Sequence, residues 1–201
     1  EEIVVDKAKD VIEEKYIDIF DLLIKKGFDL GRWKFFGDFS RQAIYNDKMD
    51  GQEMLELLED RTAFVRCKLT ENCRNTKQIC QEIQTVTGFE APDDLWSKVD
   101  GPPVEHKTYS SEEEAVEKLE ELLLLLDEKH ISSEQITILS PRRKVNSIVS
   151  KVEKCKIKDF SYSNVQNVTF STIQSFKGLE NVVIILVDVD TYDAEKLMYV
   201  A

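Results

Sequence analysis

The sequence predicts an α/β fold in which a largely parallel sheet is covered by helices on both faces. Short apolar runs typical of strands alternate along the chain with segments whose apolar residues recur at helical spacing, the order expected of βαβ units. The run NVVIILVDVD (181–190) lacks the in-out alternation of a half-exposed strand, so we expect a central strand that is buried on both faces. No internal repeat or low-complexity linker interrupts this order.

In the first half of the chain the clearest periodic segment is 16–26. Ile17, Phe20, Leu23 and Ile24 recur there at helical spacing, and Gly27 ends the predicted helix. The other elements predicted in this half are strands at 3–5, 33–36 and 63–69 and helices at 52–58 and 76–86.

The second half of the chain contains a predicted long helix with a defined start. Ser110 and Ser111 precede Glu113 and Glu114 by three residues, a capping-box pattern, and the helix is expected to continue to Lys129. The other predicted elements are strands at 106–109, 136–139, 168–173 and 182–189 and helices at 145–152 and from residue 194. The polar stretch 46–51 is the expected boundary between a domain of residues 1–50 and a domain of residues 51–201.

Composition indicates an ordinary globular protein. The 201 residues are 42% hydrophobic and 33% charged, and 27 Lys and Arg against 39 Asp and Glu leave a formal charge of -12. The longest apolar runs, 182–187 and 122–126, are far shorter than the ~20 residues that a membrane span needs, so no membrane partner is expected. The Glu-Glu start does not resemble a signal peptide, and the expected location is cytoplasmic.

The cysteines and histidines are spaced too widely for a local metal site. There is no Cys-x-x-Cys pair, and His106 and His130 stand alone, so reduced thiols are the expected state. The stretch 142–158 is strongly basic, with Glu153 among seven Lys and Arg, whereas 111–130 is acidic. Such a basic stretch is either a solvated face or a phosphate contact.

Polar residues that follow the predicted strands are the candidate ligand-binding residues, because ligands of open α/β sheets bind at the carboxyl ends of the strands. An Asp in such a place either binds Mg²⁺ or caps the next helix, and an Arg either contacts phosphate or forms an ion pair. The residues concerned are Asp6, Asp10, Asp38, Asn72, Arg74, Asn75, Thr172, Gln174, Ser175, Lys177, Gly178 and Glu180.

Five segments, taken in order, resemble the motifs of UvrD-like superfamily 1 DNA helicases. IVVDKAKD (3–10) resembles the Walker B strand, FFGDFSRQAIY (35–45) the third motif and LTENCRNT (69–76) the fourth. FSTIQSFKGLENVVII (170–185) is similar to the fifth motif, whose family pattern is Thr-x-His-x-x-Lys-Gly-Leu-Glu, with Gln174 in place of His. LMYVA (197–201) looks like the opening of the sixth motif.

The resemblance implies a RecA-like (P-loop NTPase-type) fold, with the end of a first RecA-like domain in 1–50 and most of a second in 51–201. It also implies ATP and Mg²⁺ as ligands and single-stranded DNA as a partner, with a protein partner in DNA repair or replication as a further possibility. At the nucleotide, the resemblance implies Mg²⁺ binding for Asp6, sensing of the γ-phosphate or attacking water for Gln42, and a γ-phosphate contact for Arg74. It implies ribose and phosphate contacts for Gly178 and Glu180. DNA contacts are implied for Tyr45, Thr172, Gln174 and Ser175, and Lys177 could contact either ligand.

Departures from the family pattern leave two functional interpretations. Lys7 stands where the family has the glutamate that polarises the attacking water, Lys9 replaces a glutamine, and no Walker A sequence occurs in these 201 residues. One interpretation is a piece of an ATP-dependent superfamily 1 DNA helicase or translocase, which by itself does not hydrolyse ATP. The other is a degenerate, non-hydrolysing helicase-like module that binds nucleic acid or a protein partner.

Overall fold

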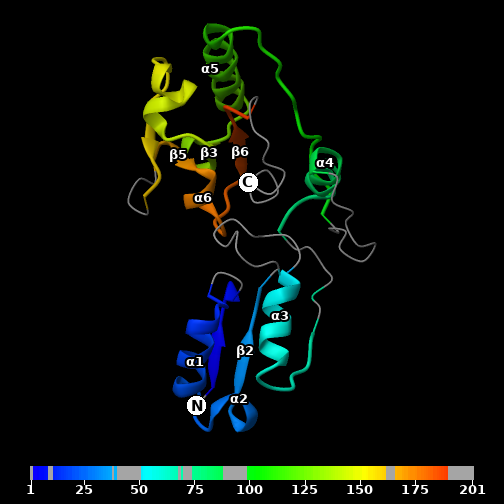
Figure 1. The fold of residues 1–201 in the computed structure, drawn as a ribbon. Helices are drawn as coiled ribbons and strands as arrows, with labels where there is room; N and C mark the ends of the chain where they lie inside the picture. The colour runs from blue at the N-terminus through cyan, green and yellow to red at the C-terminus, as the bar shows by residue number, and fades with distance from the viewer. Residues whose placement is uncertain are drawn as a thin grey trace. The chain divides into compact units, whose positions relative to one another are not determined.

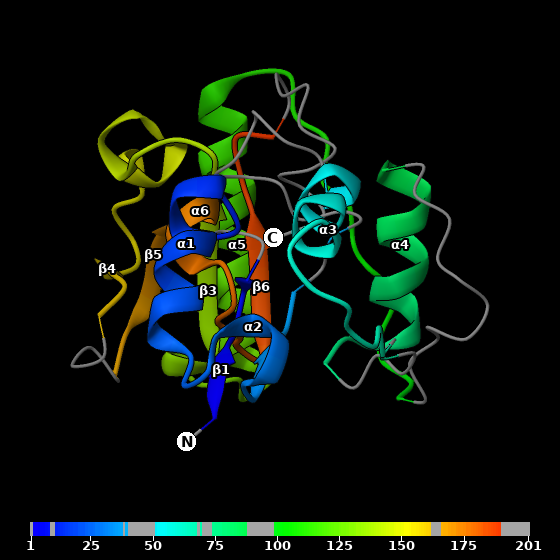
Figure 2. The same ribbon diagram turned by 60° about the horizontal axis from the view of Figure 1, so that its bottom comes forward.

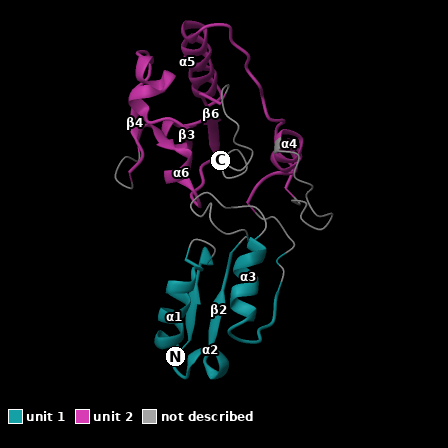
Figure 3. Cartoon of the chain, viewed as in Figure 1, with its two compact units in different colours: residues 1–73, 91–96 teal, residues 74–90, 97–201 magenta. Residues whose placement is uncertain are grey.

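The computed structural model describes residues 2–8, 11–37, 39, 51–67, 69, 74–87, 99–161 and 166–189. The chain forms two compact units, coloured separately in Figure 3. Unit 1 comprises residues 1–73 and 91–96, and unit 2 comprises residues 74–90 and 97–201.

Unit 1 is built on a pair of parallel strands. β1 (Ile3–Val5) pairs in parallel with β2 (Trp33–Phe35), and α1 (Glu14–Leu23) and α2 (Gly27–Leu30) form the crossover between them. With α3 (Gly51–Glu59), these elements confirm four of the helices and strands predicted in the first 60 residues. In Figure 1 the strand pair runs between α1 and α3.

The core of unit 1 includes α3. Met54 and Leu58 of this helix are buried with Ile12, Ile17 and Phe28 in one hydrophobic cluster. Because of this packing α3 belongs to unit 1, which comprises residues 1–73 and 91–96. The boundary at 46–51, between domains of residues 1–50 and 51–201, stays a prediction from the sequence.

Unit 2 contains a four-stranded parallel sheet with the order β4-β5-β3-β6. The strands are β3 (Ile136–Ser140), β4 (Ile157–Asp159), β5 (Val168–Thr172) and β6 (Val183–Leu186). Every residue of β3 is buried, whereas β6 is half-buried and lies at the end of the described sheet. Among the described strands β3 and β5 are the inner ones, so β6 does not meet the expectation that the run 181–190 forms a central strand buried on both faces.

Helices pack against this sheet. α5 (Glu112–Glu128) buries Ala115, Leu119 and Leu123 against Ile138 of β3 and Phe170 of β5. α6 (Ile173–Phe176) contacts the same two strands, and Figure 2 shows it on the opposite side of the sheet from α5. The predicted α/β class with a parallel sheet is confirmed.

The predicted start of the long helix is also confirmed. Ser111 accepts a hydrogen bond from the backbone N–H of Glu114 at 3.2 Å, and the Glu114 carboxylate accepts one from the backbone N–H of Ser110 at 2.7 Å. The predicted helix at 76–86 is present as α4 (Lys77–Thr87).

Three predicted elements are not found in the described residues. Residues 63–67 and 69 are not in a strand: Phe64 packs against the unit 1 core and the Trp33 ring, whereas Val65 is 86% exposed. Residues 106–109 are not a strand because this part of the chain lies beside α4, where the His106 ring contacts Glu82 at 2.8 Å. Residues 145–152 form two short 3₁₀ turns, and β4 was not predicted at all.

No helix in the described residues combines the length and the apolar character that crossing a membrane requires. The helix expected from residue 194 lies outside the described residues.

Candidate functional site

Asp6 is the predicted Mg²⁺ ligand and lies directly after β1 in unit 1. Its side chain is exposed, and one carboxylate oxygen accepts a hydrogen bond from the backbone N–H of Lys7 at 2.9 Å. Mg²⁺ sites commonly use one or two carboxylates together with substrate phosphates, so a single exposed carboxylate at this place fits such a site. Gln42 and Tyr45, as well as Lys9, Asp10 and Asp38, lie outside the described residues.

Lys7 follows Asp6 in an unusual backbone conformation. Its φ of +53° is in the left-handed region, which residues other than Gly, Asn and Asp seldom adopt. The backbone therefore turns sharply at the end of β1, directly after the candidate metal ligand.

In unit 2 the structure brings together two predicted nucleotide-binding residues that are far apart in the sequence. Nε of Arg74 lies 3.1 Å from Oε2 of Glu180, and the two side chains are 57% and 72% exposed. An exposed ion pair contributes only about 0–1 kcal/mol to stability, because water screens both charges. Replacement of Glu180 by an anionic ligand as the partner of Arg74 therefore costs little free energy.

Arg74 lies just before α4, and the start of that helix is held by residues 99–101. The backbone N–H of Lys77 donates to the carbonyl of Val99 at 2.9 Å, and the backbone N–H of Gly101 donates to Oε1 of Gln78 at 2.8 Å. Thr76 caps the helix by accepting from the backbone N–H of Ile79 at 3.4 Å.

Glu180 lies near the amino-terminal end of the β3 strand, not at the carboxyl end where the sequence placed it. The next residue, Asn181, donates to Thr137 at the start of β3, and Val183 then pairs with Ile136. The prediction was wrong because α6 and the following turn carry the chain back along the sheet between Thr172 and Glu180.

The predicted DNA-binding residues lie at the opposite end of the strands. Thr172 is in register with Ser140, the last residue of β3, and caps α6 by accepting from the backbone N–H of Ser175 at 3.3 Å. The Thr172 hydroxyl also donates to the Ser175 hydroxyl at 2.9 Å, and Gln174 is half-buried on α6.

Lys177 and Gly178 form the turn between these two groups. Gly178 has φ +84°, a left-handed conformation that a residue without a Cβ adopts without strain. The candidate residues of unit 2 are therefore divided between two ends of the sheet, Arg74 and Glu180 at one and Thr172, Gln174 and Ser175 at the other.

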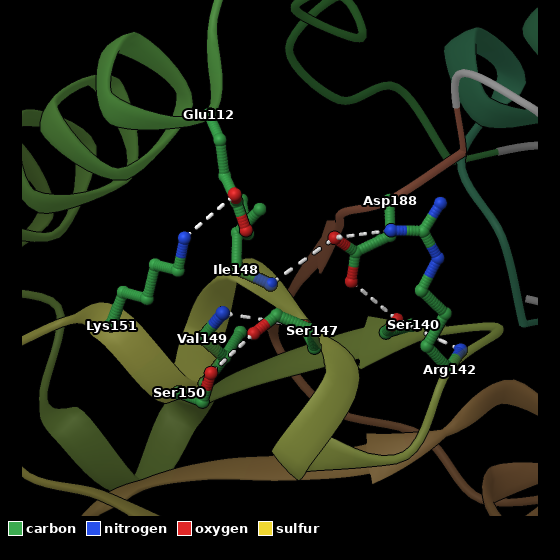
Figure 4. A network of polar contacts seen from close by, with 9 residues as sticks. All are labelled: Glu112, Ser140, Arg142, Ser147, Ile148, Val149, Ser150, Lys151 and Asp188. Carbon is green, nitrogen blue, oxygen red and sulfur yellow. Dashed lines mark hydrogen bonds and ion pairs between the residues drawn. The ribbon is translucent and has the colours of Figure 1, made fainter.

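A buried polar network at the carboxyl end of β3 and β6 was not predicted. Asp188 accepts from the Ser140 hydroxyl at 2.6 Å and from the backbone N–H of Ile148 at 3.2 Å, and Arg142 lies 4.0 Å away (Figure 4). Asp188 belongs to the apolar run 181–190, so the pattern of that run indicated a core strand and not a buried carboxylate.

The basic stretch 142–158 makes several contacts within unit 2. Lys151 pairs with Glu112 at 2.6 Å, and Lys154 pairs with Glu120 at 2.8 Å. Hydrogen bonds from the Lys154 side chain and from backbone N–H groups lower the pKa of the Glu120 carboxyl. Part of the positive charge of this stretch is thus balanced by α5, as on a solvated structural face.

Within the described residues, no group of three or more His, Cys, Asp and Glu side chains is placed to hold a metal ion. Cys67, Cys80 and Cys155 are free thiols, and burial raises the pKa of the Cys155 thiol.

No family model matches the chain, and a search of curated proteins finds no match.

Proposed function

We propose that this chain is part of an ATP-dependent superfamily 1 DNA helicase or translocase of the UvrD-like type. The observation that supports this best is the contact between Arg74 and Glu180, at 3.1 Å. The resemblance to the fourth and fifth helicase motifs assigns both residues to one nucleotide, and their closeness is compatible with that assignment.

The charges of the two residues suit a nucleotide. The planar guanidinium of Arg74 would donate to γ-phosphate oxygens and would stabilise the charge that spreads over them during phosphoryl transfer. The carboxylate of Glu180 would accept from ribose hydroxyls once Arg74 turns toward phosphate. Within unit 1, the exposed carboxylate of Asp6 would bind Mg²⁺.

The DNA contacts would lie at the other end of the sheet. Thr172, Gln174 and Ser175 offer hydroxyl and amide groups to a phosphate backbone, and Lys177 adds a positive charge. In a motor, nucleotide binding beside Glu180, at one end of the α6 connection, would then change the DNA contacts of Thr172 at its other end.

The nucleotide site is tested by titrating the 201-residue chain with a fluorescent, non-hydrolysable ATP analogue and Mg²⁺. We expect Arg74→Ala to weaken binding by about 10-fold or more, because a hydrogen bond to a charged group contributes about 1.5–3 kcal/mol. Arg66→Ala is the matched control, since Arg66 forms a similar exposed pair with Glu59 at 2.5 Å in unit 1. Equal effects of both substitutions would contradict the proposed site.

The DNA contacts are tested with a labelled oligothymidylate. Binding should weaken as salt concentration rises, because phosphate contacts release counterions, and Lys177→Ala should reduce that salt dependence. Binding that is indifferent to salt and to Lys177→Ala would contradict this part of the proposal.

A second candidate function, a non-hydrolysing binding module, is favoured by one observation. Lys7 follows Asp6 where the resemblance expects the glutamate, and an ammonium group cannot accept the proton of the attacking water. We expect no DNA-stimulated, Mg²⁺-dependent phosphate release from the chain. Release that is lost in Asp6→Ala would rule the module out.

A further inference from the structure

Asn181, which directly follows Glu180, uses its whole side-chain amide in hydrogen bonds. Nδ2 donates to the carbonyl of Glu134 at 3.0 Å and to Oγ1 of Thr137 at 2.9 Å. Oδ1 accepts from the backbone N–H of Val182 at 2.8 Å. Both N–H donors and the carbonyl oxygen of the amide are therefore occupied.

The Thr137 hydroxyl, which accepts a hydrogen bond from Asn181, belongs to a buried chain of hydrogen bonds. Thr137 is fully buried, and its Oγ1 lies 2.9 Å from Oγ1 of Thr169 on the neighbouring strand. The Thr169 hydroxyl donates to the carbonyl of Ile136 at 3.5 Å. Asn181 is thus attached to β3 and β5, the two innermost strands of the sheet.

Glu180 is held from both sides along the chain. On one side the backbone N–H of Leu179 donates to the carbonyl of Phe176 at 2.9 Å, which closes the turn after α6. On the other side Asn181 is fixed to β3. The carboxylate that meets Arg74 is therefore carried by a backbone with two anchors, although its own side chain is exposed.

We propose that Asn181 is a positioning residue that fixes Glu180 opposite Arg74. Its hydrogen bond to Thr137 attaches the turn after α6 to the Thr137–Thr169 hydroxyl pair. This role rests on the proposed nucleotide site. Asn181 does not contact the ligand, and its effect on binding passes through Glu180.

A double-mutant cycle in the 201-residue chain tests this dependence. With the fluorescent ATP analogue and Mg²⁺ we expect Asn181→Ala to weaken binding by about 3- to 10-fold, the scale of one or two lost hydrogen bonds. In a Glu180→Gln background the same change should weaken binding by less than about 2-fold, because coupled residues are not additive. Equal weakening in both backgrounds would overturn the proposal, since a general loss of structure acts whatever residue stands at 180.

Substitutions of the threonines provide conservative variants and a control. Thr137→Ser keeps the acceptor for Asn181 and should bind like the unmodified chain, whereas Thr137→Val should resemble Asn181→Ala. Thr169→Val removes a buried hydroxyl of the same pair that does not touch Asn181, so it should leave nucleotide binding within about 2-fold of the unmodified chain. A Thr169→Val effect as large as that of Thr137→Val would contradict the proposed route.

Hydrogen exchange separates this inference from the proposed function. Asn181→Ala should speed amide exchange at Leu179 and Glu180, and Thr169→Val should not. Unchanged exchange at these two amides would overturn the positioning role even if the nucleotide binds. Failure of the unmodified chain to bind the analogue, with exchange changed as expected, would instead refute the nucleotide site alone.

Discussion

The hydroxyl of Ser140 donates a 2.6 Å hydrogen bond to the carboxylate of Asp188, and both residues are buried. Ser140 ends β3, and Asp188 follows β6 with a left-handed φ of +58°. The other carboxylate oxygen accepts from the backbone N–H of Ile148, so one side chain joins two strand ends and the 3₁₀ turn at 148–151 (Figure 4). The same bond explains why no regular helix forms at 145–152, because the Ile148 N–H is directed to Asp188 instead of to a helical carbonyl.

Replacement of Asp188 by Ala should lower the free energy of unfolding by about 2–4 kcal/mol, because it leaves the Ser140 hydroxyl and the Ile148 N–H buried without an acceptor. Asp188→Asn keeps one acceptor oxygen and should lower the free energy of unfolding by less than Asp188→Ala does. Urea unfolding followed by circular dichroism measures both effects. Glu128→Ala, at the exposed end of α5, is the control and should change stability by about 0.5 kcal/mol or less. An Asp188→Ala chain as stable as this control would show that the network is not stabilising.

The elements that the sequence predicted well are those with a complete local pattern. β1 was predicted at its observed residues, and α5 begins where Ser111 and Glu114 form the expected cap. β3 and β5 are each within one residue of prediction, because their buried residues are contiguous and, apart from Ser140 and Ser171, apolar or β-branched.

The elements that the sequence did not predict depend on contacts between distant residues. β6 looked like a central strand because its composition is apolar, but the order of strands in the sheet is not encoded in any one run. The residues 63–67 have strand-like composition but pair with no strand in the described part of the chain. In the candidate site, the motifs indicated that Arg74 and Glu180 serve one nucleotide but not that their side chains touch. Asn181 and Asp188 could not be recognised because their roles depend on the residues they meet.

Glu120 should make stability depend on pH in acid. Hydrogen bonds from the Lys154 side chain and from backbone N–H groups hold its pKa below the ordinary value of 4.5. A carboxyl whose pKa is lower in the folded state contributes stability that is fully present above pH 4.5, its unfolded value, and is lost as pH falls through the folded value. Glu120→Gln should therefore be less stable than the unmodified chain at neutral pH, and this difference should shrink below pH 4.5.

Urea midpoints measured at a series of pH values test the prediction for Glu120. Glu121→Gln is the matched control, because Glu121 is the next residue on α5 and is exposed. A stability difference between Glu120→Gln and the unmodified chain that stays constant from neutral to acid pH would contradict the assignment.

Gly101 should not tolerate a larger residue, because Thr76 approaches it closely. A Cβ on Gly101 would lie 2.6 Å from Cγ2 and 2.9 Å from Cβ of Thr76. Gly101→Ala should destabilise the chain by about 1–3 kcal/mol, the range for overpacked sites, and should speed amide exchange in α4. Thr76→Ser removes Cγ2 and keeps the capping oxygen, so it should restore part of the stability in the double variant. Additive losses in the double variant would show that the collision is not the cause.

The end of α5 offers a stabilising substitution at His130. This residue has φ +61°, its backbone N–H donates to Asp127, and the backbone N–H of Ile131 donates to Leu126, which together form a Schellman motif. The left-handed position of this motif favours Gly, because a Cβ there crowds the backbone. Ile131 and Leu126 also pack in the same core cluster, the hydrophobic contact that usually accompanies the motif.

His130→Gly should therefore raise the free energy of unfolding by about 0.5–1 kcal/mol, after allowance for the greater freedom of Gly in the unfolded chain. His130→Val should lower it, because a β-branched residue is strained at positive φ. Lys129→Gly is the matched control: Lys129 has φ -79°, where Gly relieves no strain and only adds unfolded-state entropy, so stability should fall. In thermal unfolding, the His130→Gly chain should melt above the unmodified chain, and the His130→Val and Lys129→Gly chains should melt below it. A His130→Gly chain less stable than the unmodified one would mean that the imidazole makes a contribution larger than the strain of its backbone.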